Sequence, residues 1–381
     1  MNLKQETSGI GVPITRIETI SEGVIDPGRV RWVETDESTL LEFALRPGDI
    51  LFSHINSPAH IGKTAIYNGL PKPLLHGINL LLLRPDTEQV CPRWLLWLLK
   101  SDGSRNYFRR LCKRAVNQAS LNQQDIQRFT VKVPPLPEQE RIVKLLDEAD
   151  ELRKLRAQAD RRTAALLPAL FHEMFGDPDS SRNNWPASPL GNHIDLLTGF
   201  PFKSEEYVDA TVAVRLCRGA NVLPQRIDWS DVRYWPADRA NEVEQYKLCE
   251  GDVILAMDRP WISDGLKVAR LTDADLPCFL VQRVARIRPK STLNAEFVYQ
   301  SLCHPSFGIH CNMVKTETTV PHISPHNIRS FIVPVPPLPL QQEFARRVVE
   351  IRELESGQAA SRLRIENLFQ SLLHRAFNEE L

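Results

Sequence analysis

Two stretches in the amino-terminal third of the chain gather side chains suited to binding nucleic acid. Residues 105–114 carry five basic side chains in ten positions, with Tyr107 and Phe108 between them. Arginine and lysine bind guanine edges and phosphates, and asparagine and glutamine bind adenine edges, so such a mixture fits the major groove of DNA. The plain alternative is a basic helix that is only solvated. The candidate contacts of this region are His54, Asn56, His60, Lys63, Arg105, Arg109, Arg110, Lys113, Arg114, Asn117 and Gln118.

The sequence offers no constellation for catalysis or for a nucleotide. Residues 61–64, Ile-Gly-Lys-Thr, resemble the end of a phosphate-binding loop, but that loop also needs a glycine where Ser57 stands, and Pro58 lies in the flanking segment. The Asp/Asn-Pro-Pro-Tyr/Phe motif of amino-methyltransferases does not occur. We therefore predict a protein without catalytic residues and without a cofactor of its own.

The seven cysteines are scattered, odd in number and never arranged as Cys-x-x-Cys. This usage fits reduced thiols in a cytoplasm better than disulfides or a zinc ribbon. Cys303-His304 and His310-Cys311 offer four potential ligands, but their spacing matches no common metal site. We expect buried thiols beside surface histidines, and no metal.

The strongest signal in the sequence is an internal repeat with a period of about 202 residues. Gly48-Asp49-Ile50-Leu51 recurs as Gly251-Asp252-Val253-Ile254, and Arg84-Pro85 recurs as Arg288-Pro289. The proline block of residues 133–137, Val-Pro-Pro-Leu-Pro, recurs at residues 335–339. Colinear matches this far apart indicate two copies of one unit.

The second copy carries its own candidate contacts at the corresponding places. They combine basic side chains with hydroxyl and aromatic groups, the types expected at phosphates and bases. These candidates are Lys203, Arg259, Trp261, Lys267, Lys315, Thr316, Thr318 and His322.

Each copy begins with short apolar runs separated by turn residues, such as residues 49–53, 79–83 and 279–287, which read as strands. A helical stretch follows, at residues 92–99 in the first copy and 295–302 in the second. We predict two tandem α/β domains, residues 1–137 and 183–336. A central helix with a linker fills residues 138–182, and a second long helix fills residues 337–381.

Both predicted helices begin after a proline block, where proline ends one element and stiffens the approach to the next. Residues 138–175 contain no glycine and a single proline, Pro168, which predicts one long helix. Apolar residues at alternating spacings of three and four predict a coiled-coil seam on each helix. The seam residues are Ile142, Leu145, Ala149, Leu152 and Leu166 in the first helix and Phe344, Val348, Ile351, Ile365 and Phe369 in the second.

A single amphipathic helix more often packs on its own domain, but two equivalent helices favour antiparallel pairing of both seams. A helix of about 38 residues is roughly 57 Å long at ~1.5 Å per residue. One turn of B-DNA is roughly 34–36 Å. A paired rod of this length would hold two lobes a turn or more apart on one duplex, with a pseudo-twofold relation between them.

The stretches 117–126 and 133–143 resemble the conserved region of type I restriction specificity subunits, and so do residues 319–324 running into 335–341. The resemblance covers nearly the whole chain, including the doubled order of domain and helix. The second copy opens with residues 185–191 and 199–202 and then reaches the segment at Val214-Arg215. The first copy begins almost at the segment that matches Val214-Arg215, which is residues 12–16. The expected first copy is therefore short by about twenty residues: either its true start lies upstream, or the first copy lacks its opening segment and its half-site reader is incomplete.

The resemblance implies that each α/β domain is a target-recognition domain reading one half of a bipartite, asymmetric site in double-stranded DNA. It implies antiparallel helices that act as a spacer and dock two methyltransferase subunits, and a separate motor-nuclease subunit. S-adenosylmethionine, ATP and Mg²⁺ are expected on those partners, and the specificity subunit itself catalyses nothing.

Composition adds little to this interpretation. The net charge is zero, so any DNA contact must come from local patches. No apolar run reaches the ~18 residues of a membrane helix, and we expect a cytoplasmic protein without a membrane partner. Two rivals remain: an enzyme with its own site, which lacks a constellation, and a coiled-coil protein scaffold that reads no DNA.

Overall fold

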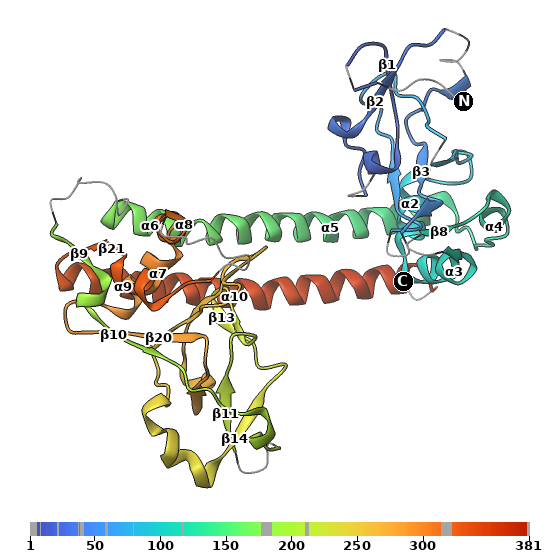
Figure 1. Cartoon of the computed structure of the whole chain (residues 1–381). Helices are drawn as coiled ribbons and strands as arrows, with labels where there is room; N and C mark the ends of the chain where they lie inside the picture. The colour runs from blue at the N-terminus through green and yellow to red at the C-terminus, as the bar shows by residue number, and fades with distance from the viewer. Residues whose placement is uncertain are drawn as a thin grey trace. The chain divides into compact units, whose positions relative to one another are not determined.

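The computed structural model describes residues 6–7, 9–20, 23–36, 38, 42–57, 60–78, 80–115, 118–176, 185–209, 213–313 and 322–378. The chain divides into two compact units, of which unit 1 combines Met1–Ala159 with Gln358–Leu381 and unit 2 is Asp160–Gly357. Two long helices, α5 (Leu136–Ala164) and α10 (Leu338–Ala376), contribute one part to each unit (Figure 1). The predicted division instead separated both helices from the α/β domains.

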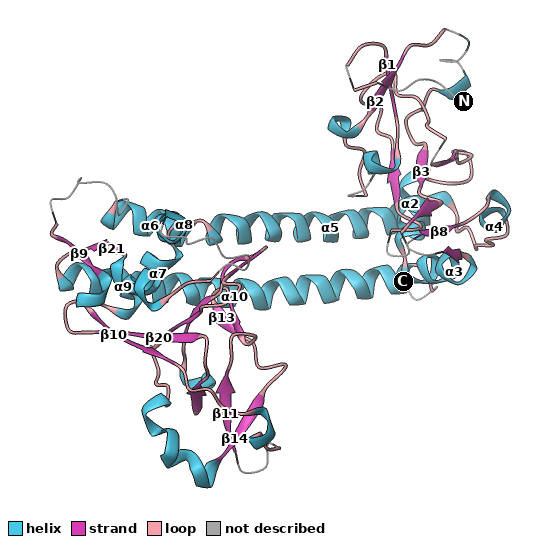
Figure 2. Cartoon of the chain, viewed as in Figure 1, coloured by secondary structure: helices cyan, strands magenta, loops and turns pink. Residues whose placement is uncertain are grey.

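In the described part of unit 1, small antiparallel sheets carry short helices on their connections (Figure 2). The strand orders are β1-β2, β5-β3-β6 and β4-β8-β7. The strands are β1 (Val12–Ile14), β2 (Arg31–Val33), β3 (Ile50–Phe52), β4 (Ile55–Asn56), β5 (Thr64–Ile66), β6 (Leu81–Leu83), β7 (Lys113–Ala115) and β8 (Gln118–Ser120). The helices are η1 (Ile17–Ile20), η2 (Pro27–Arg29), α2 (Pro92–Lys100), α3 (Asp102–Leu111) and α4 (Gln123–Gln127).

Unit 2 repeats this order with more strands. Its described sheets have the orders β10-β20-β15-β18, β14-β11-β19, β12-β13, β16-β17 and β21-β9. The first group of strands is β9 (Ala187–Pro189), β10 (Ile194–Thr198), β11 (Ala213–Cys217), β12 (Val222–Leu223), β13 (Arg226–Ile227) and β14 (Arg233–Pro236). The second is β15 (Val253–Ala256), β16 (Trp261–Ile262), β17 (Gly265–Leu266), β18 (Val268–Arg270), β19 (Cys278–Leu280), β20 (Val284–Pro289) and β21 (Ile332–Pro334).

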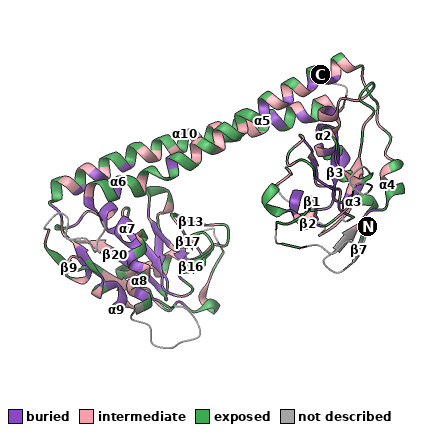
Figure 3. Ribbon diagram, turned by 90° about the horizontal axis from the view of Figure 1, so that it is seen from above, coloured by how far each residue is buried: buried purple, intermediate pink, exposed green. Residues whose placement is uncertain are grey.

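The helices of unit 2 lie before and between its strands. They are α6 (Leu166–Phe175), η4 (Leu190–Asn192), η5 (Ser204–Glu206), η7 (Ala237–Tyr246), η8 (Asp273–Asp275), α7 (Ala295–Cys303), α8 (Pro305–Met313) and α9 (Pro325–Ser330). Buried side chains concentrate where α7 covers the four-stranded sheet (Figure 3). The mixed α/β class predicted for both units is confirmed, and no described helix combines the length and apolarity needed to cross a membrane.

The repeated Gly-Asp and Arg-Pro motifs build one buried ion pair in each unit. The Asp49 carboxylate accepts hydrogen bonds from Arg84 at 2.8 and 2.7 Å, and Asp252 accepts from Arg288 at 2.6 and 2.8 Å. Both carboxylates are almost completely buried, and each also accepts a backbone N–H three residues upstream. A buried charge is tolerated only when it is paired and hydrogen-bonded, which explains why both partners recur.

In unit 1, the first part of α5 packs against the last part of α10, and the two run antiparallel there. Ile142 and Leu146 lie with Leu373 in one apolar cluster that also holds Trp94 and Trp97 of α2. Farther along α5, the Arg153 guanidinium donates to Glu366 at 2.8 Å and covers the Phe369 ring at 4.1 Å. Apolar contact therefore gives way to a charged pair along this helix.

In unit 2, the beginning of α10 packs against α6 through aromatic rings. Phe344 lies 5.6 Å from Phe171 and 5.1 Å from Phe175, centroid to centroid. Val348 is fully buried in the same cluster. Edge-to-face rings at these separations stabilise the contact beyond their buried area.

The prediction that Leu152 and Leu166 belong to the buried seam is wrong, since Leu152 is 49% exposed and Leu166 is 44% exposed. The buried face of α5 follows Ile142, Leu146 and Ala149, and its next position is Arg153 rather than Leu152. Leu145, Ile351 and Ile365 are half-buried, while Ile142, Ala149, Phe344, Val348 and Phe369 are buried.

The prediction of one continuous helix from residue 138 to residue 175 is also wrong. Helix α5 ends at Ala164, and α6 begins at Leu166 after an N-cap at Ala165. Pro168 has no N–H to donate to the carbonyl of Ala164, so an unbroken helix would lose a hydrogen bond there. Leu166 falls in the first turn of the new helix, and Phe171 and Phe175 carry its buried face instead.

A further difference concerns the expected strand at residues 279–287. The structure divides it into β19 and β20 at a turn that places Arg283 in the left-handed region, with φ of 63°. Non-glycine residues adopt such a φ rarely, and then mostly in turns. The apolar run alone gave no sign of this turn.

Candidate nucleic-acid interface

The two candidate stretches of unit 1, distant in sequence, meet in one small sheet. Strand β4, which follows His54, pairs with β8, and β8 pairs with β7 at the end of the basic stretch. The Leu121 N–H also donates to the His54 carbonyl at 2.8 Å. The sheet therefore places the loop after β3 beside the carboxyl end of α3.

Helix α3 presents arginines because its other face is anchored in the core. Phe108 is buried, 5.1 Å from the Phe52 ring and 5.0 Å from the Phe129 ring. Ser101 caps the helix by accepting the Ser104 N–H at 3.3 Å. The exposed basic side chains of α3 and of the first position of β7 are Arg105, Arg109, Arg110 and Lys113.

These cations are available to a ligand. Arg109 and Arg110 line a shallow hollow of about 400 Å³ at the end of α3. Within the described part of the chain, no carboxylate forms an ion pair with Arg109, Arg110 or Lys113. Asn117 and the side chains of Arg114 and Gln118 lie outside the described residues.

A second hollow of unit 1, of about 330 Å³, joins Lys63 to Arg105. Lys100 at the end of α2 lines it as well, and burial followed by the charge of Arg93 lowers the pKa of Lys100. Sequence reasoning missed Lys100, because it ends an apolar helix rather than belonging to a basic run.

The remaining candidates of the unit 1 loop serve different purposes. Asn56 uses its amide locally, since its Oδ1 accepts the Ser57 N–H at 2.8 Å and its Nδ2 donates to Ser53 at 3.1 Å. Burial and then the neighbouring His76 lower the pKa of His54, so this imidazole is neutral near pH 7. His60 is exposed in the turn before β5. Asn56 therefore shapes the loop, whereas His60 is exposed.

Unit 2 builds the same junction from different side chains. The Ile323 N–H donates to the Met257 carbonyl at 2.8 Å, as Leu121 does to His54 in unit 1. Asp258 forms a β-bridge with His322 and accepts a hydrogen bond from its Nδ1 at 2.6 Å. The two units thus share the backbone arrangement of this junction and differ in the side chains that the junction carries.

Asp258 also organises an arginine that sequence reasoning missed. Arg283 donates to its Oδ2 at 2.7 Å from the turn between β19 and β20. Burial raises the pKa of Asp258, but the hydrogen bonds from His322 and Arg283 outweigh it and leave the pKa lowered. The signal for Arg283 was hidden, because its turn interrupts what reads as a strand.

The other candidate contacts of unit 2 differ from one another in exposure and in hydrogen bonding. Arg259 is exposed beside Asp258 with φ of 44°, and Trp261 follows in β16 with its ring near Gly308 of α8. Lys267 is half-buried, and its Nζ donates to the Gly219 carbonyl, which assigns it a structural role.

Lys203 is exposed elsewhere in the unit, where its neighbour Phe202 packs on Trp235 at 4.8 Å. The structure does not bring it to the junction of Asp258 and His322. Lys315, Thr316 and Thr318 lie outside the described residues.

The potential metal ligands are engaged in ordinary hydrogen bonds. His304 Nδ1 lies 2.9 Å from the Ser306 hydroxyl, and His310 Nε2 lies 3.0 Å from the Asn327 carbonyl. The described residues contain no group of three or more histidine, cysteine, aspartate or glutamate side chains placed to hold a metal ion.

Comparison with known proteins gives the same family throughout. The chain matches the family model of the type I restriction modification DNA specificity domain over residues 1–160 and 233–358. It is 31% identical over 375 residues to the type I restriction enzyme MjaX specificity subunit of Methanocaldococcus jannaschii, covering 93% of this chain and 83% of that one. It is 31% identical over 245 residues to the EcoAI specificity subunit of Escherichia coli, covering 64% of this chain and 40% of that one.

Solved structures agree in fold. A chain from a structure of the assembly of the type I R-M system has a TM-score of 0.61 at 19% identity, covering 100% of this chain and 96% of that one. The type I restriction-modification S subunit from M. genitalium has a TM-score of 0.53 at 15% identity, covering 93% and 88%.

Proposed function

We propose, because this chain belongs to the family of type I restriction-modification specificity subunits, that its two units each read one half of a split DNA sequence. Family membership carries the general function, which is that of a DNA-specificity subunit. The observation that supports a division of labour is the duplicated junction, where Leu121 meets His54 in unit 1 and Ile323 meets Met257 in unit 2.

The duplicated junction supports two readers because its frame is constant and its side chains are not. In unit 1 it presents the arginines of α3, and in unit 2 it presents Arg259, Trp261, Arg283 and His322. Side chains that differ on a common backbone select different bases, while phosphate contacts set the register. This arrangement supports our proposal of an asymmetric bipartite site.

We extend the proposal to the partners of the chain. The long helices α5 and α10 would form an antiparallel coiled-coil spacer with a pseudo-twofold relation between its ends, and would dock two methyltransferase subunits and a motor-nuclease subunit. The antiparallel contacts of α5 with α10 in unit 1, and of α6 with α10 in unit 2, support it.

In this proposal the chain is non-catalytic. S-adenosylmethionine, ATP and Mg²⁺ would be held by the partner subunits in the cytoplasm. The alternative of a protein scaffold that reads no DNA is not favoured, because the relatives are specificity subunits along most of the chain.

The proposal is tested by exchanging one reader. Residues 183–336 are replaced by those of a related specificity subunit, and the variant is purified with its methyltransferase partners. Sequencing of methylated adenines should show that one half-site changes and the other stays. Unchanged recognition in both halves would remove the assignment of unit 2, and methylation by the chain alone would remove the non-catalytic role.

A further inference from the structure

A hollow of about 330 Å³ in unit 1 gathers positive charge from separate elements of the fold. Its basic side chains are Lys63, which precedes β5, Lys100 at the end of α2, Arg105 in α3 and Arg153 in α5. The Phe369 side chain of α10 lines it as well. We call this site the cationic hollow.

Two of the cations in this hollow are left without a partner. The Lys100 ammonium lies 5.2 Å from the centre of the Trp97 ring and forms no hydrogen bond or ion pair within the described part of the chain. The exposed guanidinium of Arg105 likewise forms neither with any described residue. Both groups carry several N–H donors and accept none, so their hydrogen-bonding capacity is open to an acceptor.

The carboxylates of the cationic hollow do not balance its cations. Asp150 is shared between Arg153 at 3.2 Å and Lys154 at 2.9 Å. Asp102 lines the hollow without forming an ion pair to a described residue. Four cations therefore face two carboxylates, and the hollow keeps an excess of positive charge.

This arrangement disfavours the charged form of Lys100. Burial lowers its pKa most, and the charges of Arg93 and Arg105 lower it further, while Asp150 opposes them. A bound anion would reverse the effect, because an opposite charge nearby favours the ammonium. Ionisable groups perturbed in this way inside a hollow are typical of binding sites.

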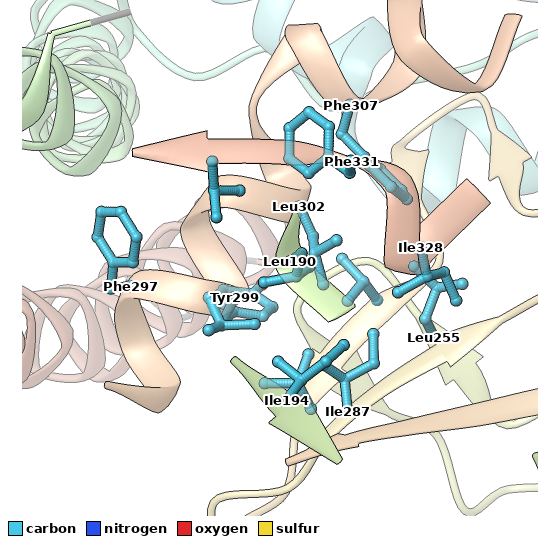
Figure 4. Close-up of a cluster of buried hydrophobic side chains, with 14 of the residues drawn as sticks. Leu190, Ile194, Leu255, Ile287, Phe297, Tyr299, Leu302, Phe307, Ile328 and Phe331 are labelled. Atoms are coloured by element: carbon cyan, nitrogen blue, oxygen red, sulfur yellow. The ribbon is translucent and has the colours of Figure 1, made fainter. Parts of the chain in front are cut away.

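The fold does not require Lys100, because unit 2 builds the same frame without it. Helices α2 and α7 are both nine residues long, and one residue separates each from the next helix, so their positions correspond. The counterpart of Lys100 is Cys303, the last residue of α7. The Tyr299 and Leu302 side chains of that helix are buried in the apolar core (Figure 4).

The other open cation is also missing from unit 2. Arg105 is the fourth residue of α3, and the fourth residue of α8 is Gly308. Lys63 does have a basic counterpart in Lys267, which likewise precedes its strand, but the Lys267 Nζ donates to the Gly219 carbonyl. The cationic hollow is therefore a property of unit 1 that the shared frame does not explain.

We propose that the cationic hollow of unit 1 binds a phosphate group, held by the ammonium of Lys100 and the guanidinium of Arg105. The planar guanidinium matches the spacing of phosphate oxygens, and the ammonium adds a point charge beside it. The phosphate is carried either by the DNA backbone or by a small free anion. Only the first of these sources rests on the proposed function.

Inorganic phosphate tests the site without DNA. The lysines of the full chain are dimethylated with a carbon-13 label, which keeps their charge, and the Lys100 signal is the one missing from Lys100→Met. Phosphate should raise the pKa of Lys100, followed by NMR, by about one pH unit relative to sodium chloride of equal ionic strength.

Variants separate binding from folding. Lys100→Met and Arg105→Gln should each weaken phosphate binding in calorimetry at least about tenfold, because each removes a charge-assisted contact. Lys144→Met removes an exposed lysine of α5 that does not line the hollow and should bind as the parent chain does. Equal binding by all of these proteins would mean an adventitious ion only and would overturn the proposal.

Thermal unfolding distinguishes a ligand-binding lysine from a structural one. Lys100→Met should not lower the melting temperature, because burial of the lysine charge is itself costly. A lower melting temperature together with unchanged phosphate binding would assign Lys100 a structural role and overturn the proposal.

Duplex DNA distinguishes the two sources of the phosphate. A response of the Lys100 signal to a duplex of arbitrary sequence alone assigns the hollow to the DNA backbone, and a response to free phosphate alone assigns it to a small anion. If the chain binds the duplex and neither ligand moves the signal, the phosphate site is refuted while the proposed function stands. If phosphate moves the signal and no duplex binds, the site stands and the proposed function fails.

Discussion

Gln139 and Gln341 make the same three hydrogen bonds in the two halves of the chain. Gln139 accepts the Cys91 N–H at 2.7 Å and donates to the carbonyls of Gln89 and Pro134 at 2.8 and 2.7 Å. Gln341 accepts the Asn294 N–H at 2.8 Å and donates to the carbonyls of Thr292 and Pro336 at 3.2 and 2.7 Å. Both amides are completely buried, so each fixes the start of a long helix to the loop before α2 or α7.

Replacement of this amide should be strongly destabilising. Gln341→Leu leaves one buried N–H and two buried carbonyls without their partner, and we expect a loss of about 3 kcal/mol in the free energy of unfolding. Urea unfolding followed by circular dichroism measures it. Gln124→Leu on the exposed face of α4 is the control, with an expected change below about 0.5 kcal/mol. Equal losses in the two variants would contradict the role of Gln341.

The contribution of an ion pair to the stability of the fold should depend on how deeply the pair is buried, and not on its charges alone. Arg288→Met leaves the carboxylate of Asp252 buried without its cation, and should cost about 3 kcal/mol, the lower end for such pairs because Arg288 is partly solvated. Arg283→Met also removes an arginine from an aspartate, but Arg283 is 72% exposed, and the cost should stay below about 1 kcal/mol. Thermal unfolding of both variants gives the comparison, and a larger cost for Arg283→Met would be incompatible with this account.

The cations at the end of α3 and at the start of β7 should contribute to DNA affinity through phosphates. We expect that neutralising Arg109, Arg110 and Lys113 to glutamine weakens the binding of the chain to DNA. Each lost phosphate contact should reduce the slope of log affinity against log salt by about 0.9. Titrations at several salt concentrations measure the slope. Arg141→Gln, which removes an arginine paired with Glu138 on α5, serves as the control; an unchanged slope in the triple variant would exclude this surface.

Protonation of Asp258 should weaken the turn that holds Arg283. Because its pKa is lowered in the folded chain, the carboxylate contributes stability above its ordinary pKa of about 3.9, and this contribution is lost as the pH falls through the folded value. Carbon-13 NMR of the carboxyl group should give a midpoint below that of a model aspartate. Arg283→Met should raise the midpoint, and a midpoint already at or above the ordinary value in the parent chain would refute the pairing.

Cysteine reactivity should divide according to burial. Burial raises the pKa of Cys278 to about 12 and also raises the pKa of the fully buried Cys217, and only the thiolate reacts with alkylating agents. Cys249 is exposed. Brief treatment with iodoacetamide at pH 8, followed by mass spectrometry, should label Cys249 and spare the other two until the chain unfolds. Rapid labelling of Cys278 in the folded chain would show that the sheet opens.

Prediction from sequence succeeded where a local pattern carries the information. The repeated Gly-Asp and Arg-Pro motifs marked the positions of Asp49 and Arg84, although their pairing became clear only in the structure. The helix seam was harder, because spacings through Leu145 and Leu152 or through Leu146 and Arg153 satisfy the same period. The packing of Trp94, Trp97 and Phe369 around Leu146 decides between them, and no local pattern encodes it.

The candidate interface was predictable only in part for the same reason. The basic run of α3 is visible in the sequence, and so is the loop after β3. Their meeting through Leu121 and His54 is a contact between distant segments, and the turn at Arg283 depends on Asp258. The sequence marked Asn56 and Lys267 as candidate contacts, whereas the structure engages both side chains in local hydrogen bonds.

The division of the chain into two units also determines the order in which they can fold during translation. Unit 2 lies between the two segments of unit 1, so a ribosome completes residues 160–357 before it produces Phe369 and Leu373. Until then Trp97 and Leu146 have no partner from α10, and the part of the apolar face of α5 that packs with Phe369 and Leu373 stays uncovered. Unit 2 can therefore fold during translation, whereas unit 1, although it begins first, closes last.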